Sequence, residues 1–136
     1  MRLDRLHKAE GEEVRKITRA GLIKKLDQVF SRSIRQHHAD FGGWVDCVTC
    51  SKRMPWEESQ AGHFIKRGHA ATRWDERNVA PQCPRCNLYL NGAQDEFAAY
   101  IVRRFGEPAL EDLIRLKHTE KRWRIPELRE LLEKYL

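Results

Sequence analysis

The chain has 136 residues, a formal net charge of +6 and a pI of about 9.4. This length is that of a single domain with its own core, and no apolar run approaches the roughly 20 residues of a membrane span. The excess of Lys and Arg favours an acidic partner, of which nucleic acid is the commonest. Because the amino-terminal sequence also lacks the apolar core of a signal peptide, we expect a cytoplasmic protein.

Residues 1–40 have the pattern of a basic helical arm. Apolar residues recur there at the three- and four-residue spacing of a buried helical stripe, and one long helix or two shorter ones both fit. Basic residues fall largely on the other faces. We predict that four of them contact DNA phosphates, with an ordinary solvated face as the equal alternative. These four are Lys24, Lys25, Arg32 and Arg35.

The four cysteines of the chain form two C-x2-C pairs, Cys47 with Cys50 and Cys83 with Cys86. Each pair aims two sulfurs at one point, and four thiolates at about 2.3 Å close the tetrahedral shell of Zn²⁺. Two disulfides or a redox C-x-x-C are the alternatives. The missing secretory signal argues against the first, and the missing βαβ pattern against the second. We therefore expect one structural zinc, with a structured insert between the pairs.

The insert holds the candidate active site. Residues 60–65 and 78–82 each have the pattern of a short strand. His63 suits a general base, because an imidazole with a pKa of about 6.5 can take a proton from water at neutral pH. Asn78 can tie the connecting loop to the strand, and Asn87 can offer an amide oxygen to Mg²⁺ or Mn²⁺. We predict these three as the catalytic residues.

The order His, Asn, Asn, ending beside the second cysteine pair, resembles that of the HNH nuclease module. That module folds as two strands and a helix around one divalent metal. Asp75 is a candidate second ligand of that metal, or a residue that caps a turn. The loop residues Lys66, Arg67 and Arg73 are candidate phosphate contacts, and the role of His69 stays open.

Residues 96–136 are predicted to form three helices. We expect Asp95 to cap the first and Gly106 to end it, and Pro108 and Pro126 to open the next two. Their apolar stripes should face a core or a dimer interface. The stripe residues are Phe97, Tyr100, Ile101, Phe105, Leu110, Leu113, Ile114, Leu128, Leu131, Leu132 and Tyr135.

From about Leu26 to its end the chain resembles the NinG, or Rap, recombination endonucleases of lambdoid phages. The resemblance implies a phage- or prophage-encoded nuclease that uses a divalent metal to cut branched intermediates such as D-loops and Holliday junctions. The chain departs from the wider HNH pattern at one position. The residue before the general base is often an acidic metal ligand, but here it is Gly62. A further ligand must come from elsewhere, and Asp75 and Asp95 are candidates. The matching residues are Val29–Ser31, Ile34–Arg35, Cys47, Cys50, Ala61–Phe64, Arg73–Asp75, Asn78–Val79, Gln82–Cys83, Cys86–Asn87, Gly92, Tyr100, Gly106, Leu113 and Trp123–Leu128.

The expected fold is therefore α+β and mainly helical. It consists of a basic arm (1–40), a zinc-stapled ββα-metal module (41–95) and carboxy-terminal helices (96–136). The expected function is a structure-specific DNA endonuclease, acting as a homodimer because a four-way junction needs two opposed cuts. The alternatives are a non-catalytic zinc-stapled module that binds nucleic acid, and a general HNH nickase without branch preference.

Overall fold

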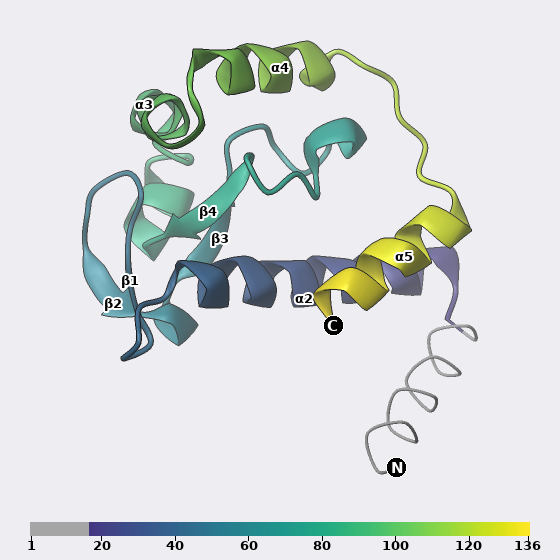
Figure 1. The fold of residues 1–136 in the computed structure, drawn as a ribbon, viewed down its shortest axis with the longest axis horizontal. Coiled ribbons are helices and arrows are strands. Elements are labelled where there is room, and N and C mark those ends of the chain that lie inside the picture. The colour runs from purple at the N-terminus through teal and green to yellow at the C-terminus, as the bar shows by residue number, and fades with distance from the viewer. Residues whose placement is uncertain (1–16) are drawn as a thin grey trace. The chain divides into compact units, whose positions relative to one another are not determined.

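The computed structural model describes residues 17–136 (Figure 1). Its contacts divide the chain into two compact units. One comprises residues up to Phe30 together with Trp123–Leu136, and the other comprises Ser31–Arg122. These boundaries differ from those of the three predicted segments. The predictions for residues 1–16 lie outside the described residues.

Helix α2 (Arg19–His38) is the single described helix of the predicted basic arm and contributes residues to both units. Its stripe Leu22, Leu26 and Phe30 is buried, as the three- and four-residue spacing predicted. In the first unit, α5 (Ile125–Tyr135) buries Leu128 and Leu132 completely. The ring of Phe30 meets that of Tyr135 edge-on with centroids 4.8 Å apart, so an aromatic contact joins the two helices.

In the second unit, α2 is followed by a hairpin that was not predicted from the sequence. Strand β1 (Trp44–Asp46) pairs antiparallel with β2 (Arg53–Pro55), and Val45 and Met54 are buried on its inner face. Each strand has only three residues, too few to produce a recognisable alternation in the sequence.

The two predicted strands of the insert are present as β3 (Gln60–His63) and β4 (Val79–Gln82). They pair antiparallel, with Gln60 opposite Gln82 and His63 opposite Val79. A five-residue π-helix (Arg85–Tyr89) follows β4. Of the predicted active-site residues, His63 ends β3, Asn78 immediately precedes β4 and Asn87 lies in the π-helix.

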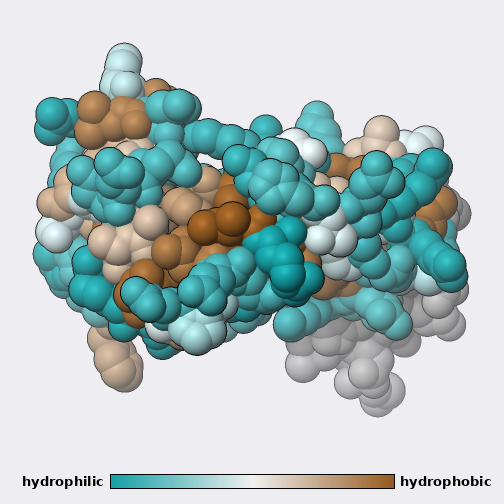
Figure 2. All heavy atoms as spheres, turned by 90° about the horizontal axis from the view of Figure 1, so that it is seen from above, coloured by the Kyte–Doolittle hydropathy of each residue, from teal (hydrophilic) through white to brown (hydrophobic). Residues whose placement is uncertain are grey.

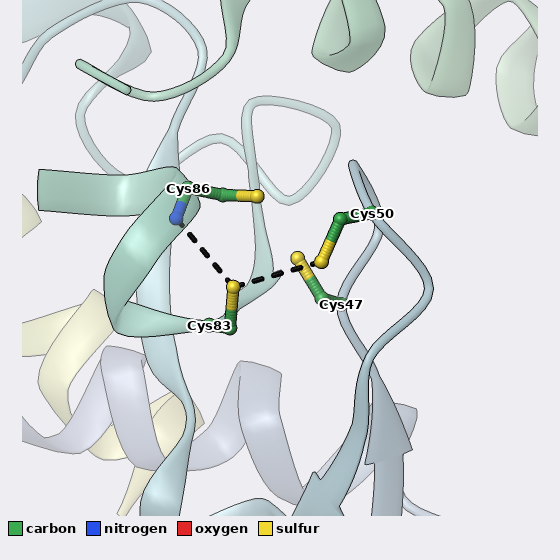
Figure 3. A group of neighbouring side chains, drawn as sticks. All are labelled: Cys47, Cys50, Cys83 and Cys86. Carbon is green, nitrogen blue, oxygen red and sulfur yellow. Dashed lines mark hydrogen bonds between the residues drawn. The ribbon is translucent and has the colours of Figure 1, made fainter. Parts of the chain in front are cut away.

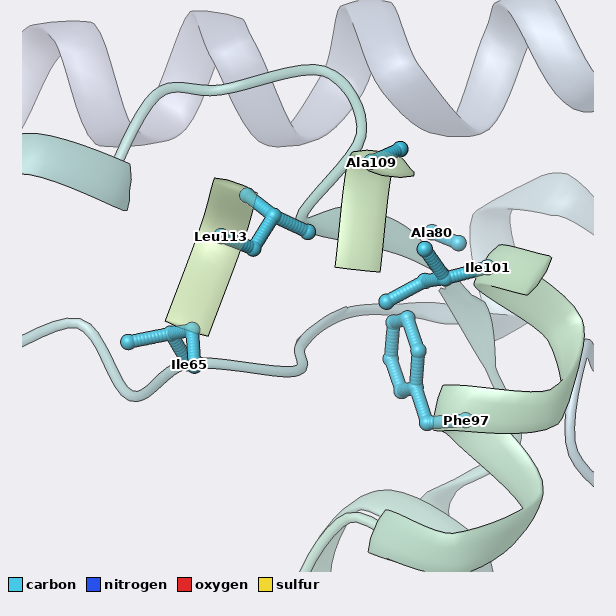
Figure 4. Close-up of a cluster of buried hydrophobic side chains, with 6 residues drawn as sticks. All are labelled: Ile65, Ala80, Phe97, Ile101, Ala109 and Leu113. Carbon is cyan, nitrogen blue, oxygen red and sulfur yellow. The ribbon is translucent and has the colours of Figure 1, made fainter. Parts of the chain in front are cut away.

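Two helices, α3 (Gln94–Phe105) and α4 (Glu107–Lys117), complete the core of this unit. Gly106, at φ 93°, ends α3 as predicted and also precedes α4. Their buried residues point toward one another and toward β4 and the end of β3 (Figure 4). The members of this cluster are Ile65, Ala80, Phe97, Ile101, Ala109 and Leu113.

One detail of the carboxy-terminal prediction is wrong. Ala93, not Asp95, occupies the cap position of α3, with left-handed φ of 47°. Phe105 and Ile114 are exposed by 38% and 45% in the single chain, and their burial at a dimer interface stays a prediction. Helical spacing marks the apolar side of a helix but does not show how much of that side is covered.

Mixed α+β architecture with small sheets is confirmed. The molecular face in Figure 2 is mostly hydrophilic, with hydrophobic areas between the hydrophilic ones. None of the helices within residues 17–136 has the length and apolar character needed to cross a membrane.

Candidate functional site

The two C-x2-C pairs meet in one cluster. Their sulfur atoms point toward one another (Figure 3), and all four lie within 4.8 Å of one another. The sulfurs of Cys50 and Cys83 are 3.6 Å apart, far beyond the roughly 2.05 Å of a disulfide bond, and all four thiols are free. Four sulfurs at tetrahedral corners about 2.3 Å from a zinc ion would lie about 3.8 Å apart. This group can therefore hold a zinc ion.

Local backbone geometry presents these thiols. The β1–β2 turn closes through hydrogen bonds from Ser51 N to Cys47 O (2.8 Å) and from Cys47 N to Lys52 O (2.8 Å). Ser51 adopts a left-handed φ of 68°. In the second knuckle, the amide of Cys86 donates to Cys83 Sγ (3.5 Å). Amide donors of this kind stabilise a thiolate, which is the form that a metal needs.

The thiol pKa values diverge as expected for crowded sulfurs. Burial alone would raise the pKa of Cys47, but hydrogen bonds from Thr49 and from neighbouring backbone amides lower it to about 6. Burial raises the pKa of Cys50, and it raises the pKa of Cys86 to about 12. The raised pKa of Cys50 and of Cys86 disfavours their thiolate forms, and a bound cation would offset that cost.

His63 lies at the end of β3, where its ring is held by the connecting loop. Its Nε2 is 3.1 Å from the carbonyl oxygen of Arg73. A carbonyl oxygen can only accept, so Nε2 carries the proton and, in the neutral ring, Nδ1 carries the lone pair. The loop thereby selects the tautomer in which Nδ1 is the basic nitrogen.

Asn78 is fully buried and clamps this loop. Its Oδ1 accepts a hydrogen bond from Ile65 N (2.7 Å), and its Nδ2 donates to Ile65 O (3.0 Å) and to Thr72 O (3.1 Å). The segment that follows His63 is thereby tied to the segment that precedes Arg73. Asn78 is a positioning residue, because its amide acts on the loop that holds the His63 ring.

Asn87 lies in the π-helix after β4, with its Nδ2 donating to Gln60 Oε1 (2.8 Å). Gln60 lies on β3 three residues before His63, so this contact brings Asn87 to the strand that carries His63. With Nδ2 held by Gln60, Oδ1 is the Asn87 atom that suits a hard cation.

The carboxylate of Asp75 is engaged by Arg77. Its Oδ1 accepts from Arg77 N (2.9 Å) and Nε (3.1 Å), and its Oδ2 accepts from Arg77 Nη2 (2.7 Å). Arg77 Nη2 also pairs with Asp112 Oδ2 at 2.9 Å. The geometry thus favours the alternative in which Asp75 stabilises a turn over its prediction as a metal ligand.

Within residues 17–136 the cysteine cluster is the only group of three or more His, Cys, Asp or Glu side chains placed to hold one ion. Asp95 is exposed in the first turn of α3 and belongs to no such group.

The predicted DNA-binding residues of α2 fall into two groups, those exposed to solvent and one that contacts other parts of the protein. Lys24, Lys25 and Arg32 are exposed on α2. Arg35 is half-buried, with its Nη1 donating to Ser59 O (3.1 Å) and its guanidinium 5.3 Å from the Trp56 ring centre. Burial lowers the pKa of Arg35. These contacts attach the end of α2 to the 56–59 turn, and a phosphate contact by Arg35 stays a prediction.

The loop that follows β3 borders a basic cavity. Lys66 is exposed, and its Nζ donates to Asn91 O (3.1 Å) and Oδ1 (3.2 Å), while Arg67 is also exposed. Arg73 stacks its guanidinium 5.3 Å from the Trp74 ring centre. A cavity of about 430 Å³ lies beside this loop, and its lining includes Lys66 and His69.

The other side of that cavity is formed by the end of α4, with Lys117 and His118. The sequence analysis missed these two as candidate DNA contacts. Charge alone could not single them out, because only the fold brings the end of α4 beside the loop after β3.

Comparisons with known proteins agree with the expected resemblance. The model of the family described as "Bacteriophage Lambda NinG protein" matches residues 4–136. Protein ninG of Escherichia phage 933W is 29% identical over 114 residues, which cover 83% of this chain and 54% of that protein. Protein ninG of phage lambda and that of Salmonella phage P22 are each 27% identical over 114 residues, covering 83% of this chain and 53% of each relative. The chain thus spans about half the length of the curated relatives it matches, and no solved structure matches it.

Proposed function

Because the chain belongs to the NinG family, we propose that it is a divalent-metal-dependent DNA endonuclease that cuts branched recombination intermediates. The proposed substrates are Holliday junctions and D-loops. The observation that carries the proposal is the setting of His63, whose tautomer is selected by a loop carbonyl that Asn78 braces. A histidine whose Nε2 donates to a fixed carbonyl keeps Nδ1 as its basic nitrogen, which is the kind of atom that a general base needs.

Zinc is proposed to have a structural role. Bound by Cys47, Cys50, Cys83 and Cys86, it would join the β1–β2 turn to the knuckle that precedes Asn87. Four sulfur ligands fill the coordination shell and leave no position for substrate. The same ion would stabilise the fold and fix the start of the π-helix, while the chemistry takes place elsewhere.

In the proposed reaction, His63 Nδ1 removes a proton from a water molecule whose oxygen attacks the phosphorus atom. The new P–O bond forms as the bond to the 3′-oxygen breaks, and that oxygen leaves with a proton from solvent. The products are a 5′-phosphate and a 3′-hydroxyl. Mg²⁺ or Mn²⁺, when bound, offsets the charge on the phosphate and on the leaving oxygen.

The proposed roles of the other residues follow from their contacts. Asn78 holds the loop so that the Arg73 carbonyl keeps Nε2 of His63 protonated. Asn87 directs Oδ1 toward the cation, because Gln60 holds its Nδ2.

The positive charge of the chain supports a nucleic-acid substrate. The proposed phosphate contacts are Lys24, Lys25, Arg32, Lys66, Arg67 and Arg73, to which the cavity beside α4 adds Lys117 and His118. Such contacts carry no base information, so binding is expected to follow the shape of the DNA. A two-fold homodimer would supply the two opposed cuts that a four-way junction needs.

The test uses zinc-loaded protein with end-labelled four-way junction, linear duplex and single-stranded DNA, each with Mg²⁺ or Mn²⁺. Wild type is compared with His63→Ala and with a control, His37→Ala, which alters an exposed histidine at the end of α2. We expect His63→Ala to cut at least about 100-fold more slowly and His37→Ala to cut like wild type. Wild type that binds the junction without cutting it would support the non-catalytic alternative, and equal cutting of linear duplex would support a general nickase.

A further inference from the structure

The cavity of about 430 Å³ beside the loop after β3 has an apolar wall, formed by three side chains of the second unit. Phe64 and Ile65 come from the segment that follows β3, and Ile114 comes from α4. Ile65 belongs to the same buried cluster as Leu113 of α4 (Figure 4), so the apolar wall rests on the core of this unit. Ile114 is 45% exposed, and a ligand with an apolar surface would remove it from water.

The cavity also has a basic wall, formed by Lys66 and His69 of the loop and by Lys117 and His118 at the end of α4. Within residues 17–136, no carboxylate lines this cavity or forms an ion pair with any of these four side chains. The charge of the two lysines is therefore available to an anion, and the imidazoles add N–H donors.

Local hydrogen bonds hold the basic wall in place. The amide of His69 donates to Lys66 O (3.0 Å), which closes the 66–69 turn. Lys66 Nζ donates to Asn91 O and Oδ1, which are neutral acceptors, so its charge is positioned without being cancelled. The amide of His118 donates to Arg115 O (3.2 Å) at the end of α4. A wall that is already ordered lowers the cost of fixing side chains when a ligand binds.

A second cavity, of about 330 Å³, separates the contributions of the two walls. His69, Lys117 and His118 line both cavities, but the second has no large apolar side chain in its lining and includes the carboxylate of Glu120. A ligand that combines an anionic group with an apolar surface therefore fits the larger cavity and not the smaller one.

The larger cavity is built on the loop that holds the proposed general base. Phe64 directly follows His63, and its amide donates to Asn78 O (2.9 Å). Asn78 also braces the loop whose Arg73 carbonyl holds the His63 ring. Occupancy of the cavity and the setting of His63 thus depend on the same loop.

We propose that this cavity binds one unpaired nucleotide of a DNA strand, with the base against the apolar wall and the phosphate against the basic wall. The volume lies in the range of small-ligand sites. The faces of a base pack on apolar and aromatic side chains, and phosphate accepts hydrogen bonds from lysine and imidazole.

This inference rests on the proposed function and supplies a physical source for its preference for branched DNA. Moving a nucleotide out of a duplex costs the energy of unstacking and unpairing, and this cost is smallest for a base that is already unpaired. A branch point offers such bases, whereas a fully paired linear duplex does not.

The test is the binding of fluorescently labelled DNA to zinc-loaded protein, measured by anisotropy without Mg²⁺ or Mn²⁺. The three probes are a fully paired duplex, the same duplex with one extra unpaired nucleotide, and that second duplex with the extra nucleotide made abasic. Ile114→Asn alters the apolar wall and Lys117→Gln alters the basic wall. The matched controls are Phe105→Asn and Arg103→Gln, which change exposed residues of α3 that line neither cavity. Zinc content and the far-ultraviolet circular dichroism spectrum are measured for each variant.

We expect wild type to bind the duplex with the unpaired nucleotide about 10-fold more tightly than the paired duplex, and the abasic probe to lose most of this preference. Each wall variant should reduce the preference to about 3-fold or less, while both controls keep it. The inference is overturned if wild type binds all three probes equally, or if either folded wall variant keeps the full preference. Full preference for the abasic probe would also overturn it, because the cavity would then take the phosphate alone. Since no cleavage is measured, a wild type that shows the preference but cuts no junction would leave the inference standing while the proposed function falls.

Discussion

Asn78 offers a quantitative test of how the loop supports the site. Asn78→Ala would leave Ile65 N, Ile65 O and Thr72 O without their partner in a fully buried setting. At about 1 kcal/mol or more for each group, with a small cavity added, the free energy of unfolding should fall by about 3–5 kcal/mol. That is a large share of the roughly 5–15 kcal/mol that stabilises a typical domain.

The assay is urea unfolding of zinc-loaded protein, with Gln36→Ala on the exposed side of α2 as the control. With a slope of roughly 1–3 kcal/mol per molar urea, the midpoint should move down by at least about 1 M. Asn78→Asp keeps the acceptor for Ile65 N but faces two carbonyls with an oxygen, so its loss should be at least as large. If Asn78→Ala lowers the free energy of unfolding by less than about 1 kcal/mol, Asn78 does not hold the loop in the way inferred here.

Three further predictions concern zinc and DNA. Cys83→Ser should lose stoichiometric zinc by metal analysis together with thermal stability, because zinc binding in such modules supplies on the order of 10 kcal/mol of folding free energy. Acidification should release zinc, because a metal needs thiolates and Cys47, with its pKa lowered to about 6, becomes protonated in the metal-free cluster as the pH falls below 6; a zinc-indicator titration should show the affinity falling steeply there. Charge reversal of Lys24, Lys25 and Arg32 should weaken junction binding and flatten its salt dependence by roughly one unit of slope per lost contact, whereas an unchanged slope would remove α2 from the DNA interface.

The sequence predicted those features that local patterns determine. Periodicity located the helices, alternation located β3 and β4 within two residues, and Gly106 marked the end of α3. The cysteine spacing also predicted the cluster, because two short knuckles leave few arrangements of four sulfurs. The β1–β2 hairpin was not predicted, because strands of three residues are too short to show an alternation of apolar and polar residues.

Roles that depend on long-range contacts could not be predicted. Arg35 and Asp75 have side chains suited to phosphate or metal, yet Arg35 binds backbone carbonyls of the 56–59 turn and Asp75 binds Arg77. The Oε1 atom of Gln82 is buried without a hydrogen-bond partner among the described residues. The sequence could not predict this either, because it arises only where β4 brings the side chain against Gly62. The sequence shows which polar side chains a chain has, but only the fold shows which of them are already bonded to other parts of the protein.

The most direct test of the account is the single-turnover rate of four-way junction cleavage by zinc-loaded wild type and His63→Ala in Mn²⁺, with junction affinity measured on the same samples without Mn²⁺. We expect equal zinc content, equal junction affinity and a cleavage rate at least about 100-fold lower for His63→Ala. Cleavage by His63→Ala at the wild-type rate would contradict the assignment of His63 as the general base.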